Sequence, residues 1–266
     1  MAVYKALTIA GSDSGGGAGI QADLKTFQEL GVYGMSVLTA LTAQNTRGVH
    51  GVMAVPPAFV EQQIDAVLSD LGTDAVKTGM LFDSAIIETV ARKLREYHVP
   101  NYVLDPVMIA KGGASLLLDE AVAAVKDQLL PLATVVTPNI PEAEVLTGLK
   151  IETVEDMKEA ARVLLRLGAQ NAVVKGGHGT GSQVTDVLYD GERFVELTEA
   201  RFDTPHTHGT GCTFAAAVTA GLAAGKTVEE AVSQGKSFIT AAICHPLGIG
   251  SEHGPTNHWA YRANNK

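Results

Sequence analysis

The stretch Thr207-His208-Gly209-Thr210-Gly211-Cys212 runs directly into Thr213-Phe214-Ala215-Ala216-Ala217-Val218, an alanine-rich segment that we expect to be helical. Gly209 and Gly211 permit backbone angles and close approaches that a side chain would block. The helix that follows offers unpaired N–H groups and the positive end of its dipole at this turn, and both favour an anion. A loop that only turns the chain into a buried helix would use the same glycines, so the rest of the sequence must decide.

Cys212 lies in the first turn of that expected helix. A helix N-terminus lowers the pKa of a thiol and favours the thiolate. A phosphate-binding turn with an activatable group at its edge is what phosphoryl transfer to a small alcohol requires. A base role for Cys212 is a hypothesis, because a lowered thiol pKa also makes a weaker base.

Composition narrows the classes of protein that fit. The chain has 266 residues, 46% of them hydrophobic, and a formal net charge of −9. No apolar run reaches the roughly 18 residues of a membrane span, and the acidic balance argues against a nucleic-acid partner. The first residues lack the pattern of a signal peptide. With two cysteines distant in sequence, Cys212 and Cys244, we expect free thiols and a cytoplasmic enzyme.

Short β-branched runs alternate with amphipathic stretches along most of the chain. The expected strands are Lys5–Ala10, Met35–Leu41, Ala75–Thr78, Tyr102–Asp105, Thr134–Thr137 and Ala172–Lys175. The expected helices between them are Gln21–Leu30, Ala58–Leu71, Ser84–Tyr97, Asp119–Leu130 and Val154–Leu167. This alternation predicts an α/β fold, with a mostly parallel sheet covered by helices on both faces.

The remainder of the chain predicts one antiparallel edge and two further helices. Val184–Tyr189 and Arg193–Leu197 flank Asp190-Gly191, a strong hairpin signal. Gly211–Ala224 and Val228–Cys244 are expected to be helical. Without repeats, low-complexity tracts or linkers, residues 1–266 are predicted to form a single domain.

Ligands of open α/β sheets bind at the carboxyl ends of the strands, where this chain carries several polar groups. The first strand leads into Gly11-Ser12-Asp13-Ser14-Gly15-Gly16-Gly17-Ala18-Gly19, which lets backbone approach a flat ligand closely. Asp23 follows inside the next helix, where a first-turn acid that complements the dipole is the plainer interpretation. Gln44, beyond the second strand, has the donors and acceptor that suit an amine and a ring nitrogen, although an ordinary loop amide has them too.

Three oxygen-bearing residues follow the fourth and fifth strands. Asp105, Asn139 and Glu142 are hard ligands of the kind that magnesium prefers, partly through water. Asn139 also fits the N-cap of a helix with Pro141 inside it and Glu142 at the third position, and both interpretations can hold together. Lys175, beside two glycines at the end of the sixth strand, suits a phosphate, with a solvated lysine as the alternative.

In combination and in this order, these motifs resemble a known family, the ribokinase-fold vitamin kinases, and within it bacterial hydroxymethylpyrimidine/phosphomethylpyrimidine kinase of thiamin biosynthesis. The resemblance covers nearly the whole chain. Its motifs are 10–23, Lys77-Thr78-Gly79-Met80, Asp105-Pro106-Val107-Met108, 137–143, Lys175-Gly176-Gly177-His178, 207–212 and Gly254-Pro255-Thr256-Asn257-His258. Sugar-kinase relatives carry an aspartate where this chain has Cys212, and the cysteine marks the vitamin-kinase branch.

The resemblance implies a ribokinase-like three-layer sandwich and a role for each site residue. Gly209, Thr210 and Gly211 would bind the transferring phosphoryl group, with Cys212 beside the substrate hydroxymethyl group. Asp105 and Glu142 would organise Mg²⁺, and Asn139, Lys175 and Thr210 would contact ATP. Asp23 and Gln44 would hydrogen-bond the pyrimidine, which would pack against Ala18, Met80 and Val107.

The implied reaction is ATP-dependent phosphorylation of 4-amino-5-hydroxymethyl-2-methylpyrimidine, and then of its monophosphate to the diphosphate. Pyridoxal kinase is the nearest alternative, and Gln44 is expected to discriminate, since an amide suits an aminopyrimidine edge and pyridoxal-directed relatives tend to be apolar there. A non-catalytic vitamin- or nucleotide-binding regulator is a third possibility, disfavoured by the joint presence of Asp105, Glu142, Lys175 and Cys212. The family is commonly homodimeric, so a homodimer is expected.

Overall fold

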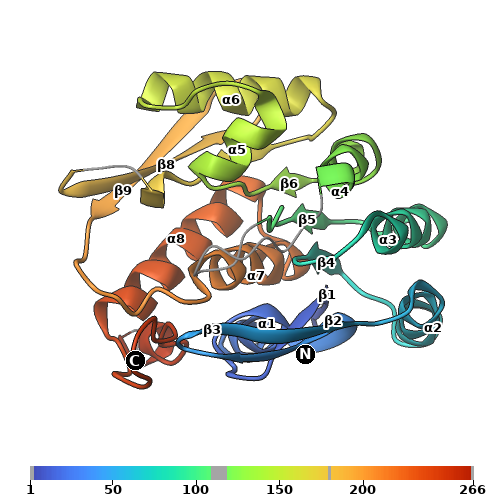
Figure 1. Cartoon of the computed structure of the whole chain (residues 1–266). Coiled ribbons are helices and arrows are strands. Elements are labelled where there is room, and N and C mark those ends of the chain that lie inside the picture. The colour runs from blue at the N-terminus through green and yellow to red at the C-terminus, as the bar shows by residue number, and fades with distance from the viewer. Residues whose placement is uncertain (1–2, 109–118, 179–180, 265–266) are drawn as a thin grey trace.

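The β-branched runs of the sequence form the middle layer of the molecule. The computed structural model describes residues 3–108, 119–178 and 181–264, and within these ranges nine strands form one sheet. The strands are β1 (Lys5–Asp13), β2 (Tyr33–Asn45), β3 (Gly48–Ala54), β4 (Ala75–Thr78), β5 (Tyr102–Leu104), β6 (Val135–Val136), β7 (Ala172–Val174), β8 (Gln183–Tyr189) and β9 (Phe194–Ala200). Their spatial order is β3-β2-β1-β4-β5-β6-β7-β8-β9 (Figure 1).

The six central strands, β2, β1 and β4 to β7, pair in parallel, as predicted. The hairpin around Asp190-Gly191 forms as expected, and β8 and β9 make an antiparallel edge. A further antiparallel pair, which the sequence did not predict, joins β3 to β2 at the opposite end of the sheet. Most of β3 is exposed, so its sequence lacks the apolar alternation that would have predicted it.

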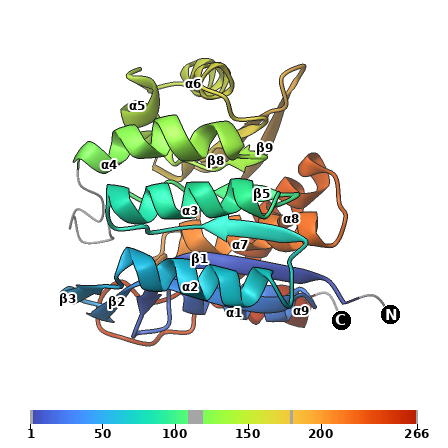
Figure 2. The ribbon, with the colours of Figure 1, turned by 90° about the vertical axis from the view of Figure 1, so that its right-hand side faces the viewer.

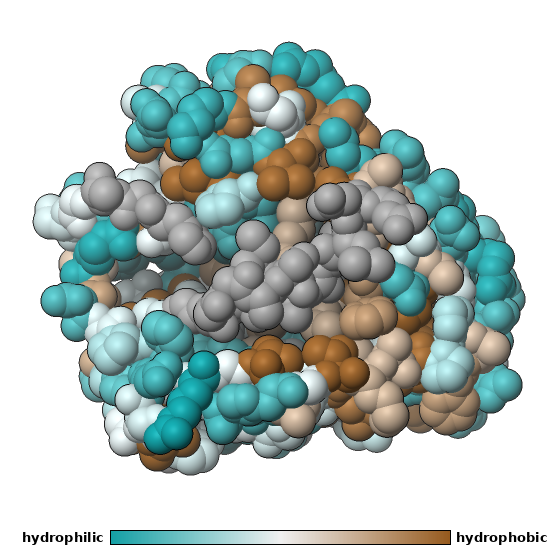
Figure 3. All heavy atoms as spheres, in the orientation of Figure 1, coloured by the Kyte–Doolittle hydropathy of each residue, from teal (hydrophilic) through white to brown (hydrophobic). Residues whose placement is uncertain are grey.

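Helices cover both faces of the sheet, which confirms the three-layer sandwich (Figures 1 and 2). The helices are α1 (Gly19–Glu29), α2 (Pro57–Leu68), α3 (Ser84–Glu96), α4 (Asp119–Ala124), α5 (Ile140–Thr147), α6 (Val154–Arg166), α7 (Thr210–Ala223), α8 (Val228–Cys244) and α9 (Ala260–Asn264). One face carries α2 to α6, and the other carries α1, α7 and α8. Hydrophilic side chains cover α6 at the top of Figure 3, as its amphipathic pattern predicts.

One predicted helix, Asp119–Leu130, takes a different form. After α4 the chain widens into a π-helical turn, Val125–Leu129, and then tightens into a 3₁₀ turn, Leu130–Leu132. Pro131 lies in that last turn and has no N–H with which to continue an α-helix.

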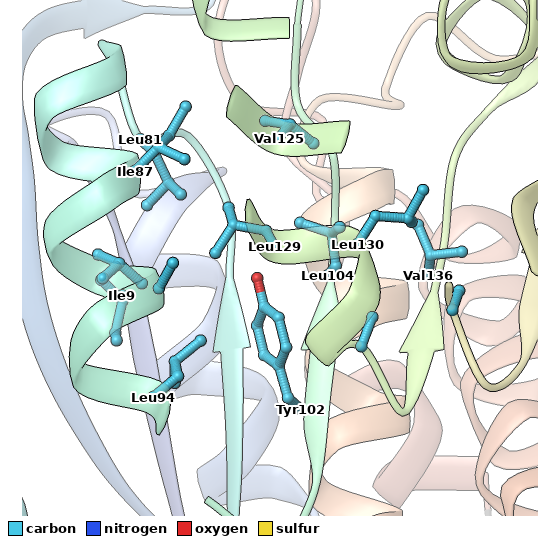
Figure 4. Close-up of a cluster of buried hydrophobic side chains, with 14 of the residues drawn as sticks. Ile9, Leu81, Ile87, Leu94, Tyr102, Leu104, Val125, Leu129, Leu130 and Val136 are labelled. Carbon is cyan, nitrogen blue, oxygen red and sulfur yellow. The ribbon is translucent and has the colours of Figure 1, made fainter. Parts of the chain in front are cut away.

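The larger apolar core lies between the sheet and α2 to α6. Figure 4 shows Tyr102 of β5 among Leu94 of α3, Leu104 of β5 and Leu129. The Tyr102 hydroxyl lies 2.6 Å from the Thr78 hydroxyl, so this buried polar atom keeps a hydrogen bond. This apolar packing holds the parallel strands in place, and polar residues lie at the carboxyl ends of those strands. Among the described residues, no helix has both the length and the apolarity to cross a bilayer.

Candidate active site

A cavity of about 660 Å³ opens at the carboxyl ends of the parallel strands and at the start of α7. It brings together residues from most of the chain, from Ala10 to Ile243. Twelve of the thirteen residues predicted for the site line it, namely Ala18, Gln44, Met80, Asp105, Val107, Asn139, Glu142, Lys175, Gly209, Thr210, Gly211 and Cys212. The thirteenth, Asp23, does not.

The turn before α7 has the geometry of an anion site. Gly209 is the N-cap in the left-handed region, with φ at +83°, and a Cβ there would lie 1.8 Å from the Gly17 carbonyl oxygen. Only glycine therefore fits at this position. The N–H groups of Gly211 and Cys212, in the first turn, have no partner within the helix, whose first bond is donated by Thr213 to Gly209. They and the helix dipole favour a negative group in the cavity.

Asp105 and Lys175 form a charged pair beside this turn. Lys175 Nζ lies 3.2 Å from Asp105 Oδ1, and the Asp105 side chain is 2% exposed. Burial alone would lower the pKa of Lys175, but the carboxylates of Asp105 and Glu142 raise it, so the lysine keeps its charge. Among the described residues, Asp105 Oδ2 is buried without a hydrogen-bond partner. An unpartnered carboxylate oxygen at this position has the capacity to accept one further ligand.

Asn139 and Glu142 form the capping box that the sequence predicts. Asn139 Oδ1 accepts from the Glu142 N–H, and Glu142 Oε2 accepts from the Asn139 N–H, both at 2.9 Å. Burial, together with the nearby Asp105 carboxylate, raises the pKa of Glu142 to about 7. Glu142 also accepts a backbone hydrogen bond from Met108, and carboxylate oxygens that accept backbone donors keep lone pairs with which they could ligate a cation.

The structure contradicts the expectation that the helix N-terminus gives Cys212 a thiolate. Burial raises the pKa of the Cys212 thiol to about 12, an effect that the nearby cation of Lys77 offsets only in part. The carboxylates of Asp23 and Asp105 add to the increase. Because α7 meets a buried, acid-lined environment, desolvation outweighs the dipole and the thiol stays protonated at neutral pH. Cys212 and Cys244 are both free, as predicted.

Asp23, for which the resemblance implies a hydrogen bond to the pyrimidine, does not line the cavity. Asp23 lies inside α1, completely buried, with Oδ2 3.0 Å from Lys77 Nζ and 2.7 Å from the Thr8 hydroxyl. Its Oδ1 is buried without a hydrogen-bond partner among the described residues, so a hydrogen bond between Asp23 and the pyrimidine stays a prediction. Asp23 is the fifth residue of α1 and lies beyond its first turn, so it is not a first-turn acid that complements the helix dipole.

At the other end of the cavity, Gln44 faces a small apolar surface. Gln44 lies within β2, not in a loop beyond the strand, because β2 continues into the hairpin with β3. Met80 is 8% exposed. A Cβ on Gly11 would lie 3.2 Å from the Met80 sulfur, so glycine at this position of β1 allows the sulfur to approach the strand closely. Gln44, Met80, Ala18 and Val107 all line the cavity, and this part of its wall, called the slot below, combines an amide with apolar side chains, which suits a flat ring.

Asp13 and His208 are two residues at the site for which the sequence predicted no role. Asp13 accepts three backbone hydrogen bonds from its own glycine-rich loop and lies 2.9 Å from His208 Nε2, in the loop before α7. Its position two residues before Gly15 is a local signal for such a turn. The contact with His208, which is 195 residues away, has no such signal.

A second buried pair supports the far end of the cavity. Lys236 of α8 lies 2.9 Å from Asp186 Oδ2, and Asp186 Oδ1 accepts from the Gly176 N–H at 2.8 Å. This pair holds the turn after β7 that positions Lys175. The sequence spacing gave no indication of it.

Comparison with known proteins agrees with this geometry. A family model described as phosphomethylpyrimidine kinase matches residues 13–257. The hydroxymethylpyrimidine/phosphomethylpyrimidine kinase of Bacillus subtilis (strain 168) is 57% identical over 265 residues, which cover 99% of this chain and 98% of that protein. Pyridoxine kinase of the same organism is 49% identical over 268 residues, 99% of each chain.

Among solved structures, the ADP complex of Bacillus subtilis pyridoxal kinase superposes with a TM-score of 0.92 at 47% identity, covering 99% of this chain and all of that one. The match therefore extends to the strand ends and loops that build the cavity. On the family model and on these identities, the chain belongs to the phosphomethylpyrimidine kinase family.

Proposed function

We propose that this chain is an ATP-dependent kinase that phosphorylates 4-amino-5-hydroxymethyl-2-methylpyrimidine and then its monophosphate, in thiamin biosynthesis. One observation carries the proposal. A single cavity joins the slot formed by Gln44 and Met80 to the anion-binding turn at Gly209 and to the Asp105–Lys175 pair. A flat heterocycle in the slot would therefore direct its hydroxymethyl group at a phosphoryl group held on the turn.

The catalysis that these residues support is positioning and charge neutralisation. The free N–H groups of Gly211 and Cys212 would hold the transferring phosphoryl group, and Lys175 would neutralise charge on the ATP phosphates. Asn139 and Thr210 line the same part of the cavity. Cys212, as a neutral thiol, would orient the substrate hydroxyl and would not act as its base. In a loose transition state the hydroxyl loses its proton late, so no strong base is needed.

The residues present fit a magnesium ion. Among the described residues Asp105 Oδ2 is buried and unpartnered, and the Glu142 carboxylate lines the same cavity, so both would ligate it directly or through water. Within the described ranges no group of three His, Cys, Asp or Glu side chains is close enough to hold a metal alone. Water and phosphate oxygens would complete the ligand set. When bound, Mg²⁺ supplies charge neutralisation of the transferring phosphoryl group.

Pyridoxal is the second candidate substrate, since the pyridoxine and pyridoxal kinases of Bacillus subtilis are close relatives of this chain. Its ring also carries a nitrogen and a hydroxymethyl group. Gln44 supports the pyrimidine, because an amide can pair with an amine and a ring nitrogen at once. A non-catalytic regulator would need neither the Asp105–Lys175 pair nor a vacant carboxylate oxygen at the anion site.

Three broader features belong to the same proposal. We propose that residues 1–266 act as one kinase domain, supported by the single sheet that spans the described residues. A homodimer is supported by exposed apolar residues on the β2–β3 hairpin, where Leu41 and Met53 are cross-strand partners. Two free thiols and the need for ATP support the cytoplasm as its location.

The test is magnesium-dependent ADP release by the purified protein, offered hydroxymethylpyrimidine, its monophosphate or pyridoxal. Turnover of both pyrimidines is the expected result. Turnover of pyridoxal alone would assign the chain to vitamin B6 salvage, and binding of these compounds without ADP release would support a regulator.

A further inference from the structure

Two glycine-rich loops that are distant in the sequence touch at the mouth of the substrate slot. A Cβ on Gly17 would lie 2.5 Å from His208 Cδ2, and a Cβ on Gly209 would lie 1.8 Å from the Gly17 carbonyl oxygen. The loop after β1 and the anion-binding turn therefore fit together only with glycine at both positions. His208 lies at this junction, with its side chain 12% exposed.

Asp13 fixes the ring of His208. Its carboxylate is 3% exposed and accepts from the N–H groups of Gly15, Gly17 and Ala18 at 2.8 to 3.0 Å. A carboxylate that receives three backbone donors is an ionised acceptor. Because His208 Nε2 lies 2.9 Å from Asp13 Oδ2, Nε2 must carry a hydrogen, whether the ring is neutral or charged.

The hydrogen on His208 Nε2 determines whether the oxygen or the nitrogen of the Gln44 amide can lie beside the ring. Two atoms of the network, His208 Nε2 and Gln44 Nε2, are 3.5 Å apart, which would bring two N–H groups face to face. On the other side, Thr42 Oγ1 lies 2.9 Å from the Ser12 carbonyl oxygen and 3.1 Å from Gln44 Oε1. A hydroxyl has one hydrogen and cannot donate to both oxygens at once.

Reversing the amide removes both conflicts. The amine of Gln44 then donates to the Thr42 oxygen, whose hydrogen serves Ser12. The carbonyl oxygen of Gln44 then lies beside His208 Nε2, whose one hydrogen stays with Asp13 Oδ2, so this 3.5 Å contact is an electrostatic attraction that replaces a repulsion and is not a second full hydrogen bond. One amide hydrogen and one carbonyl lone pair are left for the cavity. This is the pattern by which a glutamine pairs with the amine and ring nitrogen of adenine.

We infer that His208 is a positioning residue for substrate selection: held by Asp13, it fixes the Gln44 amide in the orientation that reads an aminopyrimidine edge. The inference deepens the proposed function and rests on it. His208 also directly precedes Gly209. The residue that orients the Gln44 amide therefore belongs to the same turn that is proposed to bind the phosphoryl group.

The experiment compares hydroxymethylpyrimidine with 5-hydroxymethyl-2-methylpyrimidine, the same ring without the 4-amino group. A matched pair of variants, His208→Gln and His208→Met, has nearly the same length, but only glutamine keeps an N–H at the position of Nε2. We expect His208→Met to lower the ratio of kcat/KM for the two compounds roughly tenfold, the effect of one misdirected hydrogen bond, mainly through KM of the amine-bearing compound. His208→Gln should restore most of the ratio.

A second pair tests the other side of the amide and does not depend on the folding of His208→Met. Thr42→Val removes the hydroxyl at constant shape, and Thr42→Ser keeps it. The valine variant should lower the same ratio, and the serine variant should not.

An equal loss of kcat with both compounds in His208→Met, or an unchanged ratio in both His208→Met and Thr42→Val, would overturn the inference. Absence of hydroxymethylpyrimidine turnover in the unmodified enzyme would instead refute the proposed function, before any variant is made.

Discussion

Cys212 is the residue for which local and tertiary effects oppose each other most clearly. Its place in the first turn of α7 predicts a thiolate, yet burial beside Asp23 and Asp105 raises its pKa to about 12. At neutral pH the thiol is therefore protonated. Desolvation of a complete charge outweighs the partial charge of a helix end.

We therefore expect Cys212→Ser to keep kcat within about tenfold of the unmodified enzyme, since a hydroxyl also orients the substrate hydroxyl. Cys212→Ala should lose more, and the pH profile of kcat should keep its shape in both variants. Steady-state kinetics between pH 6 and 9 provide the check. A loss of 10²-fold or more in Cys212→Ser, together with loss of an ionisation from the profile, would restore a thiolate base.

Gln44 is the residue whose replacement tests substrate choice directly. In Gln44→Met the amide is lost while length and volume are kept, so kcat/KM for hydroxymethylpyrimidine should fall between about 10-fold and 100-fold relative to pyridoxal. ADP release measured with each substrate gives the ratio. If relative use of the two compounds does not change, Gln44 does not select the pyrimidine.

At the scale of single elements, α5 combines a structural cap with a site residue. Asn139 caps the helix through its Oδ1 and also lines the cavity, so its two roles must be separated. Asn139→Ala should lower the free energy of unfolding by about 1 kcal/mol, and Asn139→Ser should recover most of it, because serine is a good N-cap.

If Asn139 also contacts ATP, the KM for ATP should rise in both variants, because serine lacks the amide. Urea denaturation and ATP titration of kinase activity measure the two quantities. Recovery of both stability and KM in Asn139→Ser would show that the residue acts through the cap alone.

The elements that sequence predicted well are those whose signals are local. The capping box of α5 depends on residues three apart, and the β8–β9 hairpin depends on Asp190-Gly191. In contrast, β3 has no periodic pattern because both of its faces meet solvent, so the position of Gln44 inside a hairpin could not be predicted.

At the scale of the whole molecule, the limits of prediction are set by contacts between distant segments. The resemblance to a family placed twelve site residues on the cavity wall, since those residues follow strand ends that meet by topology. The burial of Asp23 by Lys77, 54 residues away, and the Asp13–His208 contact depend on tertiary packing. Neither pair has a sequence spacing that would reveal it.

The segment that follows α8 contacts α7 through a buried histidine. His258 is 4% exposed, with Nε2 3.0 Å from the Thr213 hydroxyl in α7. Burial lowers the pKa of His258 from its ordinary 6.5 to about 4. Between these values the unfolded chain binds the proton more tightly than the folded one, so stability falls as the pH decreases through this window. The full difference, present above pH 6.5 and lost by pH 4, corresponds to about 3 kcal/mol.

We expect the unmodified protein to lose about 2 kcal/mol more than His258→Gln when the pH falls from 8 to 5, because glutamine keeps a hydrogen bond but does not titrate. Urea denaturation of both proteins at the two pH values measures this, and carboxylates that titrate in the same range cancel in the difference. At pH 8 the variant should be the less stable of the two, because the packing of the imidazole is lost. Equal losses of stability in the two proteins would show that His258 is protonated in the folded state, and that the C-terminal segment opens without unfolding the sheet.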